Sequence, residues 1–195
     1  IENIFTNVDC ILAGENKGYA TANNIGLKSV KTKYALVLNP DTILDKDAIK
    51  FFFNAKEQIK DFWLIGPANN QIINFNDNDS NLKEVNNLKG FAIFFNLSKF
   101  NQDYFDENFF LFFEEIDLCR RVKKNKGKIY LHKNIFIKHD GASSVNKTNK
   151  LDLEKTRNWH WMWSTFYYHK KHGGYLKAFS LMYGKLVRAF VKMLV

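Results

Sequence analysis

Short apolar runs alternate with helical segments through the first third of the chain, and this alternation constrains the fold more than any other feature. Three apolar runs are predicted strands: Val8–Ala13, Tyr34–Leu38 and Phe62–Ile65. Tyr19–Val30 and Asp47–Ile59 are predicted helices between them. The continuous apolar character of Tyr34–Leu38 is typical of a strand in a parallel sheet covered on both faces. The order strand, helix, strand, helix, strand predicts an α/β domain.

The rest of the chain predicts shorter strands, one central helix and a long helical C-terminus. The predicted elements are, in chain order, a strand-like stretch over Leu82–Leu97, a helix over Glu114–Lys126, one or two strands within Lys128–Lys138, and helix from Leu151 onward with an interruption at Gly173-Gly174. The chain is therefore expected to divide into an α/β domain, 1–145, and a helical extension, 146–195.

Composition excludes several classes of protein. A length of 195 residues fits one globular domain, and 46% hydrophobic residues with 19 Phe exclude disorder. Cys10 and Cys119 stand alone, which argues against a disulfide scaffold and favours a reducing compartment. The sequence contains no run of 18 apolar residues, so it predicts no membrane span.

The net charge of +9 belongs to the C-terminal part of the chain. Residues 1–118 carry 11 Lys and Arg against 17 Asp and Glu, whereas residues 119–195 carry 18 against three. This asymmetry favours contact with an anionic surface, such as nucleic acid, acidic lipid or a phosphorylated substrate. A Lys-rich composition with solvated side chains is the alternative.

The motif Asn39-Pro40-Asp41 directly follows a predicted strand. Open α/β sheets bind ligands just beyond the carboxyl ends of their strands, and Asp41 is a suitable oxygen ligand for a hard divalent cation. The alternative is a turn in which Pro40 stops the strand and Asp41 or Thr42 caps the next helix. His139 follows another apolar run, and a lone histidine there is structural or exposed unless a partner such as Asp41 lies beside it.

Three carboxylates, Glu114, Glu115 and Asp117, stand at a predicted helix start. Complementation of the helix dipole is one explanation. The preceding apolar run, Phe109–Phe113, favours another, because desolvation raises the pKa of a carboxylate and suits it to general base catalysis. The turn at Asn16-Lys17-Gly18 also enters a helix whose N-terminus favours phosphate, or is an ordinary strand-to-helix connection.

In this order the motifs resemble family 2 glycosyltransferases with the GT-A fold, specifically the bacterial rhamnosyltransferase-like branch. The resemblance covers about residues 5–145. The motifs that carry it are Asn16-x-Gly18-x4-Asn23, Leu38-Asn39-Pro40-Asp41-Thr42, Gly66-Pro67, Gly90, Phe105-Asp106-Glu107-x-Phe109-Phe110, Glu114-Glu115-x-Asp117-Leu118 with Arg121, and His139.

The resemblance implies a GT-A mixed sheet flanked by helices and a metal-dependent, inverting hexosyltransferase. In this family the acid ending the first motif belongs to a DxD-type site, which holds Mg²⁺ or Mn²⁺ against the diphosphate of a nucleotide-sugar. Asp41 keeps that carboxylate here, while Asn39 is implied as a neutral ligand or ribose contact. His139 is implied as a further metal ligand. Glu115 is implied as the catalytic base and stands where Asp is commoner, which adds one methylene to its reach.

The other implied site residues contact the two substrates. The implied donor-binding residues are Asn16, Gly18, Asn23, Asn39 and Asp41. The implied acceptor and sugar contacts are Gly90, Phe91, Glu114, Asp117 and Arg121. The resemblance thus implies transfer of rhamnose or another hexose from a nucleotide-diphosphate donor to a glycan or lipid-linked acceptor. The implied setting is cell-surface polysaccharide biosynthesis at the cytoplasmic face of the membrane.

Family members normally open with a strand, a loop and a helix that hold the nucleotide base. This sequence begins after those elements, at Ile1, and is therefore expected to be N-terminally incomplete. That expectation leaves a second hypothesis open: a catalytically inactive GT-A-like module that binds glycolipid or a partner protein. Nucleic-acid binding is a third, but it rests on basic charge alone, and the acidic first part counts against it.

Residues 175–195 predict a basic amphipathic helix. Four basic residues fall on one stripe of this helix: Lys177, Lys185, Arg188 and Lys192. Such a helix can lie on an anionic membrane surface, or it can pack on the domain with a solvated basic face. The aromatic segment Arg157–Trp163 is expected to stack on sugar rings, lie at lipid head groups or pack in the core.

Overall fold

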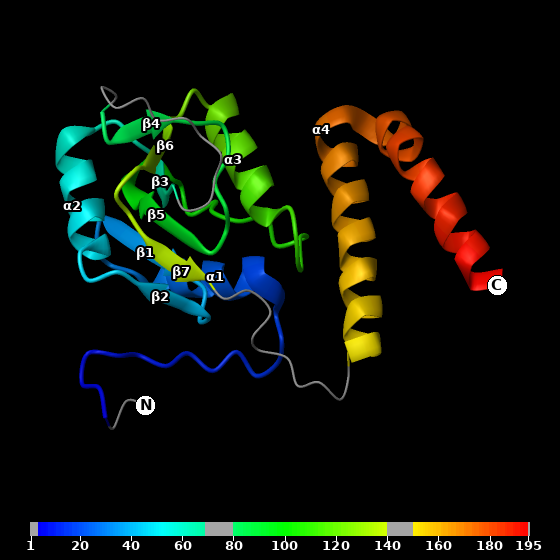
Figure 1. Ribbon diagram of the computed structural model, residues 1–195, viewed down its shortest axis with the longest axis horizontal. Helices are drawn as coiled ribbons and strands as arrows, with labels where there is room; N and C mark the ends of the chain where they lie inside the picture. Colours follow the sequence, from blue (N-terminus) through cyan, green and yellow to red (C-terminus); the bar gives the residue numbers. More distant parts are fainter. Residues whose placement is uncertain (1–3, 69–79, 140–149, 195) are drawn as a thin grey trace.

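The computed structural model describes residues 4–68, 80–139 and 150–194 (Figure 1). A five-stranded sheet has the order β1-β5-β3-β6-β4, in which β3 and β6 are parallel and the other neighbours antiparallel. Its strands are β1 (Tyr34–Leu38), β3 (Leu64–Pro67), β4 (Leu82–Glu84), β5 (Ala92–Asn96) and β6 (Ile129–His132). The flanking helices are α1 (Gly18–Ser29), α2 (Ala48–Gln58) and α3 (Glu114–Lys124), with a 3-10 turn at Leu97–Lys99. The predicted mixed α/β class is confirmed, and the arrangement is consistent with a GT-A-like fold.

Strand β5, which lies between β1 and β3, is buried at every position because side chains pack against both of its faces. Phe95 faces the layer of α1 and α3, where it lies in one cluster with Leu27 and Leu118. Phe94 faces the other layer and contacts Phe52 of α2, with 5.2 Å between the ring centroids. An uninterrupted apolar run is what a strand covered on two sides requires.

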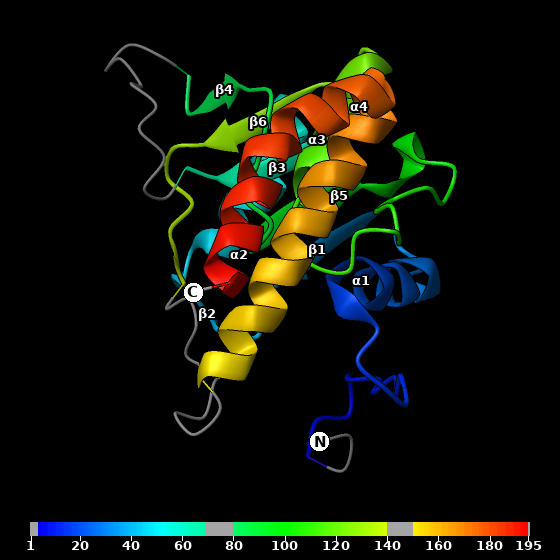
Figure 2. The ribbon, with the colours of Figure 1, turned by 90° about the vertical axis from the view of Figure 1, so that its right-hand side faces the viewer.

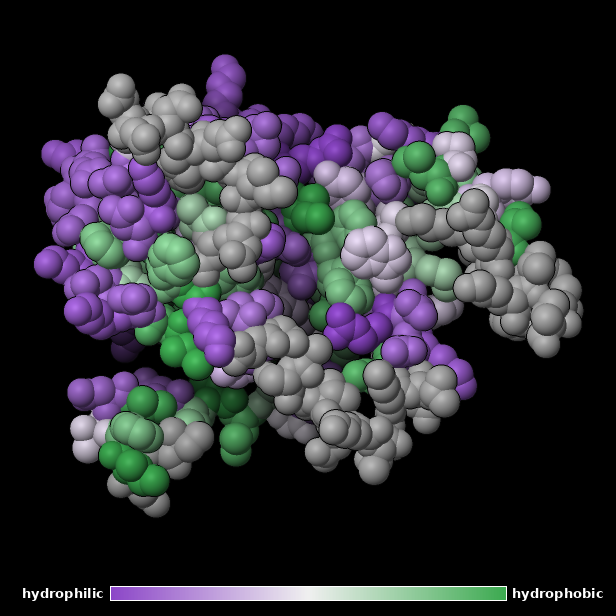
Figure 3. Space-filling model, in the orientation of Figure 1, coloured by the Kyte–Doolittle hydropathy of each residue, from purple (hydrophilic) through white to green (hydrophobic). Residues whose placement is uncertain are grey.

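The predicted strand Val8–Ala13 is wrong. This segment forms no strand, and its apolar side chains are exposed, Leu12 by 93%. In Figure 3 the N-terminal part of the chain, at the lower left, shows hydrophobic side chains beside hydrophilic ones. An apolar run becomes a strand only where a neighbouring strand pairs with its backbone N–H and C=O groups, and no strand among the described residues does so.

The expectation of a parallel setting for Tyr34–Leu38 is also wrong. Within the described residues β1 pairs only with β5, and this pairing is antiparallel, with Tyr34 opposite Asn96. Only Val37 of β1 is buried. Apolar character reports the burial of a strand and does not distinguish the direction of its neighbour.

A second, two-stranded sheet joins β2 (Thr42–Leu44) to β7 (Ile137–His139). The strands are antiparallel, and Thr42 lies opposite His139. Strand β2 was not predicted: the residues after Pro40 were expected to hold a metal ligand at Asp41, or a turn that caps the next helix. This pairing brings the end of the Asn39-Pro40-Asp41 motif beside His139.

The C-terminal helix α4 (Lys150–Leu194) is bent at Gly174, whose φ of 84° and ψ of 170° are not helical. The predicted interruption at Gly173-Gly174 is therefore confirmed. The two arms, 150–173 and 175–194, form a hairpin on the side of α3 and diverge away from the bend (Figures 1 and 2). Phe166 of the first arm contacts Phe179 of the second, with 5.4 Å between ring centroids. Met182 is also buried.

In the described part of the chain, no helix is long and apolar enough to cross a membrane. The predicted basic stripe depends on Lys185, Arg188 and Lys192, whose side chains lie outside what the structure describes. The predicted domain boundary near residue 145 lies outside the described residues as well.

Candidate active site

The first polar cluster joins Asp41 to His139. The Asp41 Oδ1 and His139 Nε2 atoms are 3.3 Å apart, and both side chains are partly exposed. Phe91 stacks on the His139 ring with 4.9 Å between centroids and 9° between planes. Asp41 is therefore the partner beside His139 that the sequence analysis required before counting His139 as a candidate metal ligand.

The two side chains of this cluster could supply two of the ligands of a divalent cation. Adjacent ligands of an octahedral Mg²⁺ lie about 3 Å apart, because each metal–oxygen bond is about 2.1 Å. The observed separation of 3.3 Å is close to this spacing. In the described part of the chain no group of three or more His, Cys, Asp and Glu side chains could hold a metal. Such a cation would complete its shell with substrate phosphate and water, as Mg²⁺ commonly does.

The second cluster consists of Glu114 and Glu115 in the first turn of α3. Glu114 is only 6% exposed, and its Oε2 atom has no hydrogen-bond partner. Burial and the charge of Glu115 raise the pKa of Glu114 to about 8. Burial likewise raises the pKa of Glu115, against backbone N–H groups that lower it. Carboxylates in such surroundings hold protons more tightly and suit general base catalysis.

Tyr19 and Gly90 lie against these carboxylates. The Tyr19 hydroxyl donates a hydrogen bond to the Gly90 carbonyl. A Cβ atom at Gly90 would lie 3.6 Å from Glu115 Cβ and 3.6 Å from the Tyr19 oxygen. The next residue, Phe91, contacts His139, so the Gly90-Phe91 segment lies between the two clusters.

Tyr19 is a further candidate site residue, which the sequence analysis did not select. Its pKa is raised by burial and by the charges of Glu114 and Glu115. Its ring packs edge-on against Phe105. The available signal was its position directly after Gly18, in the turn already singled out.

Three of the predicted donor-binding residues, Asn16, Gly18 and Asn23, lie at the start of α1, and Asn39 follows β1. The Gly18 N–H donates to Asn16 Oδ1 at 3.0 Å, and Asn23 Nδ2 donates to the Tyr19 carbonyl at 2.8 Å. The Asn39 N–H donates to the Phe91 carbonyl at 2.9 Å. The first two bonds are local to the start of α1, and the third places the end of β1 beside Phe91.

We expect Gly18→Ala to destabilise the protein by about 2 kcal/mol more than Gly14→Ala. Both glycines have left-handed φ angles, 76° and 77°. A Cβ at Gly18 would lie 2.5 Å from the Phe110 carbonyl oxygen, whereas nothing lies within 4 Å at Gly14. Urea unfolding of the two variants checks this difference. Equal losses of stability would contradict close packing of Phe110 on Gly18.

Asp117 lies in an ion network between α3 and α4. It is fully buried and accepts hydrogen bonds from Arg121 Nε at 2.8 Å and from Lys171 Nζ. His172 Nε2 lies 2.7 Å from its other oxygen. Arg121 is six residues beyond Glu115, which is about 9 Å further along the helix. The structure therefore brings Arg121 to Asp117 but not to Glu114 and Glu115.

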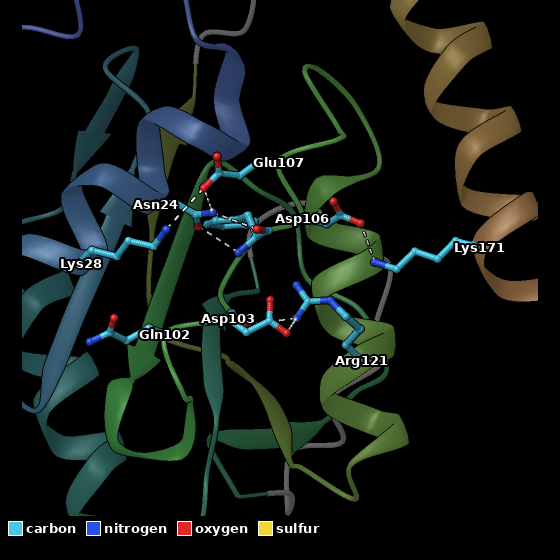
Figure 4. A pocket seen from close by; sticks show the side chains of 9 residues that line it. Asn24, Lys28, Gln102, Asp103, Asp106, Glu107, Arg121 and Lys171 are labelled. Carbon is cyan, nitrogen blue, oxygen red and sulfur yellow. Dashed lines mark hydrogen bonds and ion pairs between the residues drawn. The ribbon is translucent and has the colours of Figure 1, made fainter.

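A cavity of about 410 Å³ lies beside this network (Figure 4). Of the predicted site residues, only Arg121 lines it. Its charged groups are paired: Arg121 with Asp103, and Lys171 with Asp106. Burial opposes ionisation of Asp106, but hydrogen bonds from Lys171 and Asn108 hold its pKa at about 2. The cavity is separate from the two clusters.

We expect Glu114→Gln to stabilise the protein at pH 9 and to leave stability unchanged at pH 4. The pKa of Glu114 is about 8 in the folded chain against an ordinary 4.5. Its neutral form therefore favours folding fully below pH 4.5, and that contribution is lost as the pH rises through 8. Glutamine stays neutral throughout, so the Tm difference should grow with pH, to about 5–10 °C. Thermal melts at both pH values, with the exposed Glu57→Gln as control, test this. A variant less stable than the parent at pH 9 would overturn it.

The chain was compared with family models and with known proteins. No family model matches the chain. Over 139 residues the chain is 27% identical to the low-salt glycan biosynthesis hexosyltransferase of Haloferax volcanii, with 57% of this chain and 45% of that protein covered. The chain thus spans less than half the length of this relative. The likeness supports a glycosyltransferase family without distinguishing the rhamnosyltransferase-like branch.

Proposed function

We propose that this chain is the catalytic part of an inverting, metal-dependent glycosyltransferase that acts in glycan biosynthesis. The observation that carries the proposal is the placement of two clusters on either side of Gly90-Phe91. Asp41 and His139 form one, and the buried Glu114 forms the other with the partly buried Glu115. The likeness to a hexosyltransferase supports the same class of reaction. The donor is a nucleotide-diphosphate hexose, and the acceptor a glycan or lipid-linked hydroxyl.

In the proposed reaction Glu115 removes the proton from the acceptor hydroxyl as its oxygen attacks the anomeric carbon. The new carbon–oxygen bond forms while the bond to the diphosphate breaks, which inverts the anomeric centre. Asp41 and His139 would hold Mg²⁺ or Mn²⁺, whose positive charge stabilises the leaving diphosphate. The buried surroundings of Glu115 match this role, because they raise its affinity for a proton.

Calorimetric titration of the chain with pyrophosphate and with UDP, each with and without Mn²⁺, tests the ligand site. We expect binding that requires the metal and is lost in Asp41→Ala and His139→Ala. Asp45→Ala is the matched control, because it removes an exposed carboxylate just after β2. Binding without dependence on Mn²⁺ or Asp41 would contradict the metal site. It would favour the inactive GT-A-like module instead.

We also propose that α4 holds the protein at an anionic membrane surface on the cytoplasmic side. Aromatic residues of both arms are exposed, among them Trp159 at 61%, Trp163 at 46% and Tyr183 at 71%. No Asp or Glu follows Glu154, whereas eight Lys and Arg do. Exposed aromatic rings with basic neighbours favour an anionic lipid interface.

Co-sedimentation with vesicles tests this membrane proposal. We expect binding to phosphatidylglycerol-containing vesicles that weakens in high salt and in the variant Trp159→Ala/Trp163→Ala. Equal binding to pure phosphatidylcholine, or none to either, would contradict it.

A further inference from the structure

The aromatic loop, Phe109–Phe113, leads directly into α3 and its two carboxylates. The first arm of α4 contacts every residue of this loop. The contacts are Phe109 with Tyr167 at 4.9 Å between ring centroids, Phe110 stacked on His160 at 4.4 Å, Ser164 Oγ donating to the Leu111 carbonyl at 2.8 Å, Phe112 with Trp161 at 5.3 Å, and Phe113 with Trp161 and Tyr168, each at 5.3 Å. The loop is therefore held along its whole length by one partner element.

The end of the aromatic loop has an unfavourable backbone conformation. Phe112 and Phe113 have φ angles of 71° and 70°, in the left-handed region. This region costs a residue other than glycine about 1–2 kcal/mol, and such a residue keeps it only where its surroundings impose it. Trp161 contacts both rings. The structure thus contains a strained turn together with the side chain that holds it.

That strained turn sets the direction of the first turn of α3. Phe113 is the residue immediately before the helix, so its backbone angles determine where Glu114 and Glu115 point. The same loop also reaches α1, because the Phe110 carbonyl accepts the Tyr19 N–H at 2.9 Å. One loop therefore connects the donor-side helix to the carboxylates.

The arm itself is anchored independently of the loop. Lys171 and His172 contact the fully buried Asp117 of α3 at 2.8 and 2.7 Å. Lys171 also pairs with Asp106 at 2.7 Å. An arm fixed in this way can impose a conformation on the loop rather than follow it.

We propose that the first arm of α4 is a positioning element of the active centre, with Trp161 as its main positioning residue. By holding Phe112 and Phe113 in the left-handed conformation, it keeps Glu115 against Gly90. The inference rests on the proposed role of Glu115 as catalytic base, and it extends the active centre beyond the α/β domain into the helical extension. Without Trp161 the turn relaxes, and the carboxylates lose their fixed position.

The experiment compares Trp161→Ala with Trp159→Ala in the full chain. Trp161 is 44% exposed and Trp159 is 61% exposed, so neither substitution empties a core. We expect amide hydrogen exchange over residues 112–118 to speed up by about tenfold in Trp161→Ala and to stay unchanged in Trp159→Ala. Trp161→Phe keeps an aromatic contact and should restore most of the protection. Unchanged exchange in Trp161→Ala, or equal changes in both alanine variants, would overturn the proposal.

A kinetic comparison separates this proposal from the proposed function. Where the parent transfers sugar, we expect kcat of Trp161→Ala to fall by about 10- to 100-fold, with the donor KM within about twofold. A changed KM with unchanged kcat would overturn the positioning role. Absence of transfer from the parent under all conditions counts against the proposed function only, because hydrogen exchange still tests the contact between α4 and the loop.

Discussion

Glu115→Gln should reduce sugar transfer by about a thousandfold. Glutamine has nearly the same size and shape as glutamate but cannot accept the acceptor proton as it leaves. Glu115 lies beside Gly90 and Tyr19, so the substitution removes a charge without removing the packing of its side chain. Initial rates of transfer from a nucleotide-sugar give the measurement. The donor KM should change little, because the base acts on the acceptor.

The control for this prediction is Glu57→Gln, an exposed carboxylate on α2 with the same chemical change. It should transfer sugar at the parent rate. Transfer by Glu115→Gln at the parent rate would overturn the assignment of the base. The neighbouring Glu114 would then be the next residue to test, because it is buried beside Glu115 and one of its carboxylate oxygens has no hydrogen-bond partner.

Asp117→Ala should lower the free energy of unfolding by about 3 kcal/mol and Tm by about 10 °C. Asp117 is fully buried and pairs with Arg121, Lys171 and His172. Its loss leaves three cationic or polar groups without their shared partner at the contact between α3 and α4. Thermal melts monitored by circular dichroism give the measurement.

Asp103→Ala is the matched control for Asp117→Ala. Asp103 also pairs with Arg121, at 3.3 Å, but its side chain is 78% exposed. Exposed ion pairs contribute about 0–1 kcal/mol, so this variant should melt close to the parent. Similar losses in both variants would show that burial of Asp117 adds nothing to the stability of the α3–α4 contact.

Much of the fold could be predicted from local patterns. Helices α1, α2 and α3 lie within two residues of their predicted ends, and the bend in α4 falls at Gly173-Gly174. Periodicity and glycine determine such features because both act through neighbouring residues. The prediction of a strand over Val8–Ala13 was wrong because strand formation does not depend on neighbouring residues alone. Its apolar pattern was suitable for a strand, but strand formation depends on a partner elsewhere in the chain.

The candidate site also has features that the sequence could predict and features that depend on the fold. Asp41, His139, Glu114 and Glu115 could be selected as candidates from residue type and motif order. The family resemblance implied that Asp41 and His139 meet at one metal, but local patterns alone could not show it, because the two residues meet through the pairing of β2 with β7. Tyr19 was missed because its hydroxyl acts on Gly90, which is distant in sequence. The site-residue assignments themselves stay predictions until the variants are measured.

The sequence alone determined the α/β class, the helices, the bend in the C-terminal segment and the identity of the candidate carboxylates. Each of these follows from short-range patterns of apolar side chains, glycines and charges. Only the tertiary structure decided that the aromatic segment near Trp161 packs on Phe112 and Phe113. It also decided that Asp117 is buried in ion pairs with α4. Both contacts join residues more than 45 positions apart, and such contacts depend on how packed elements meet in space.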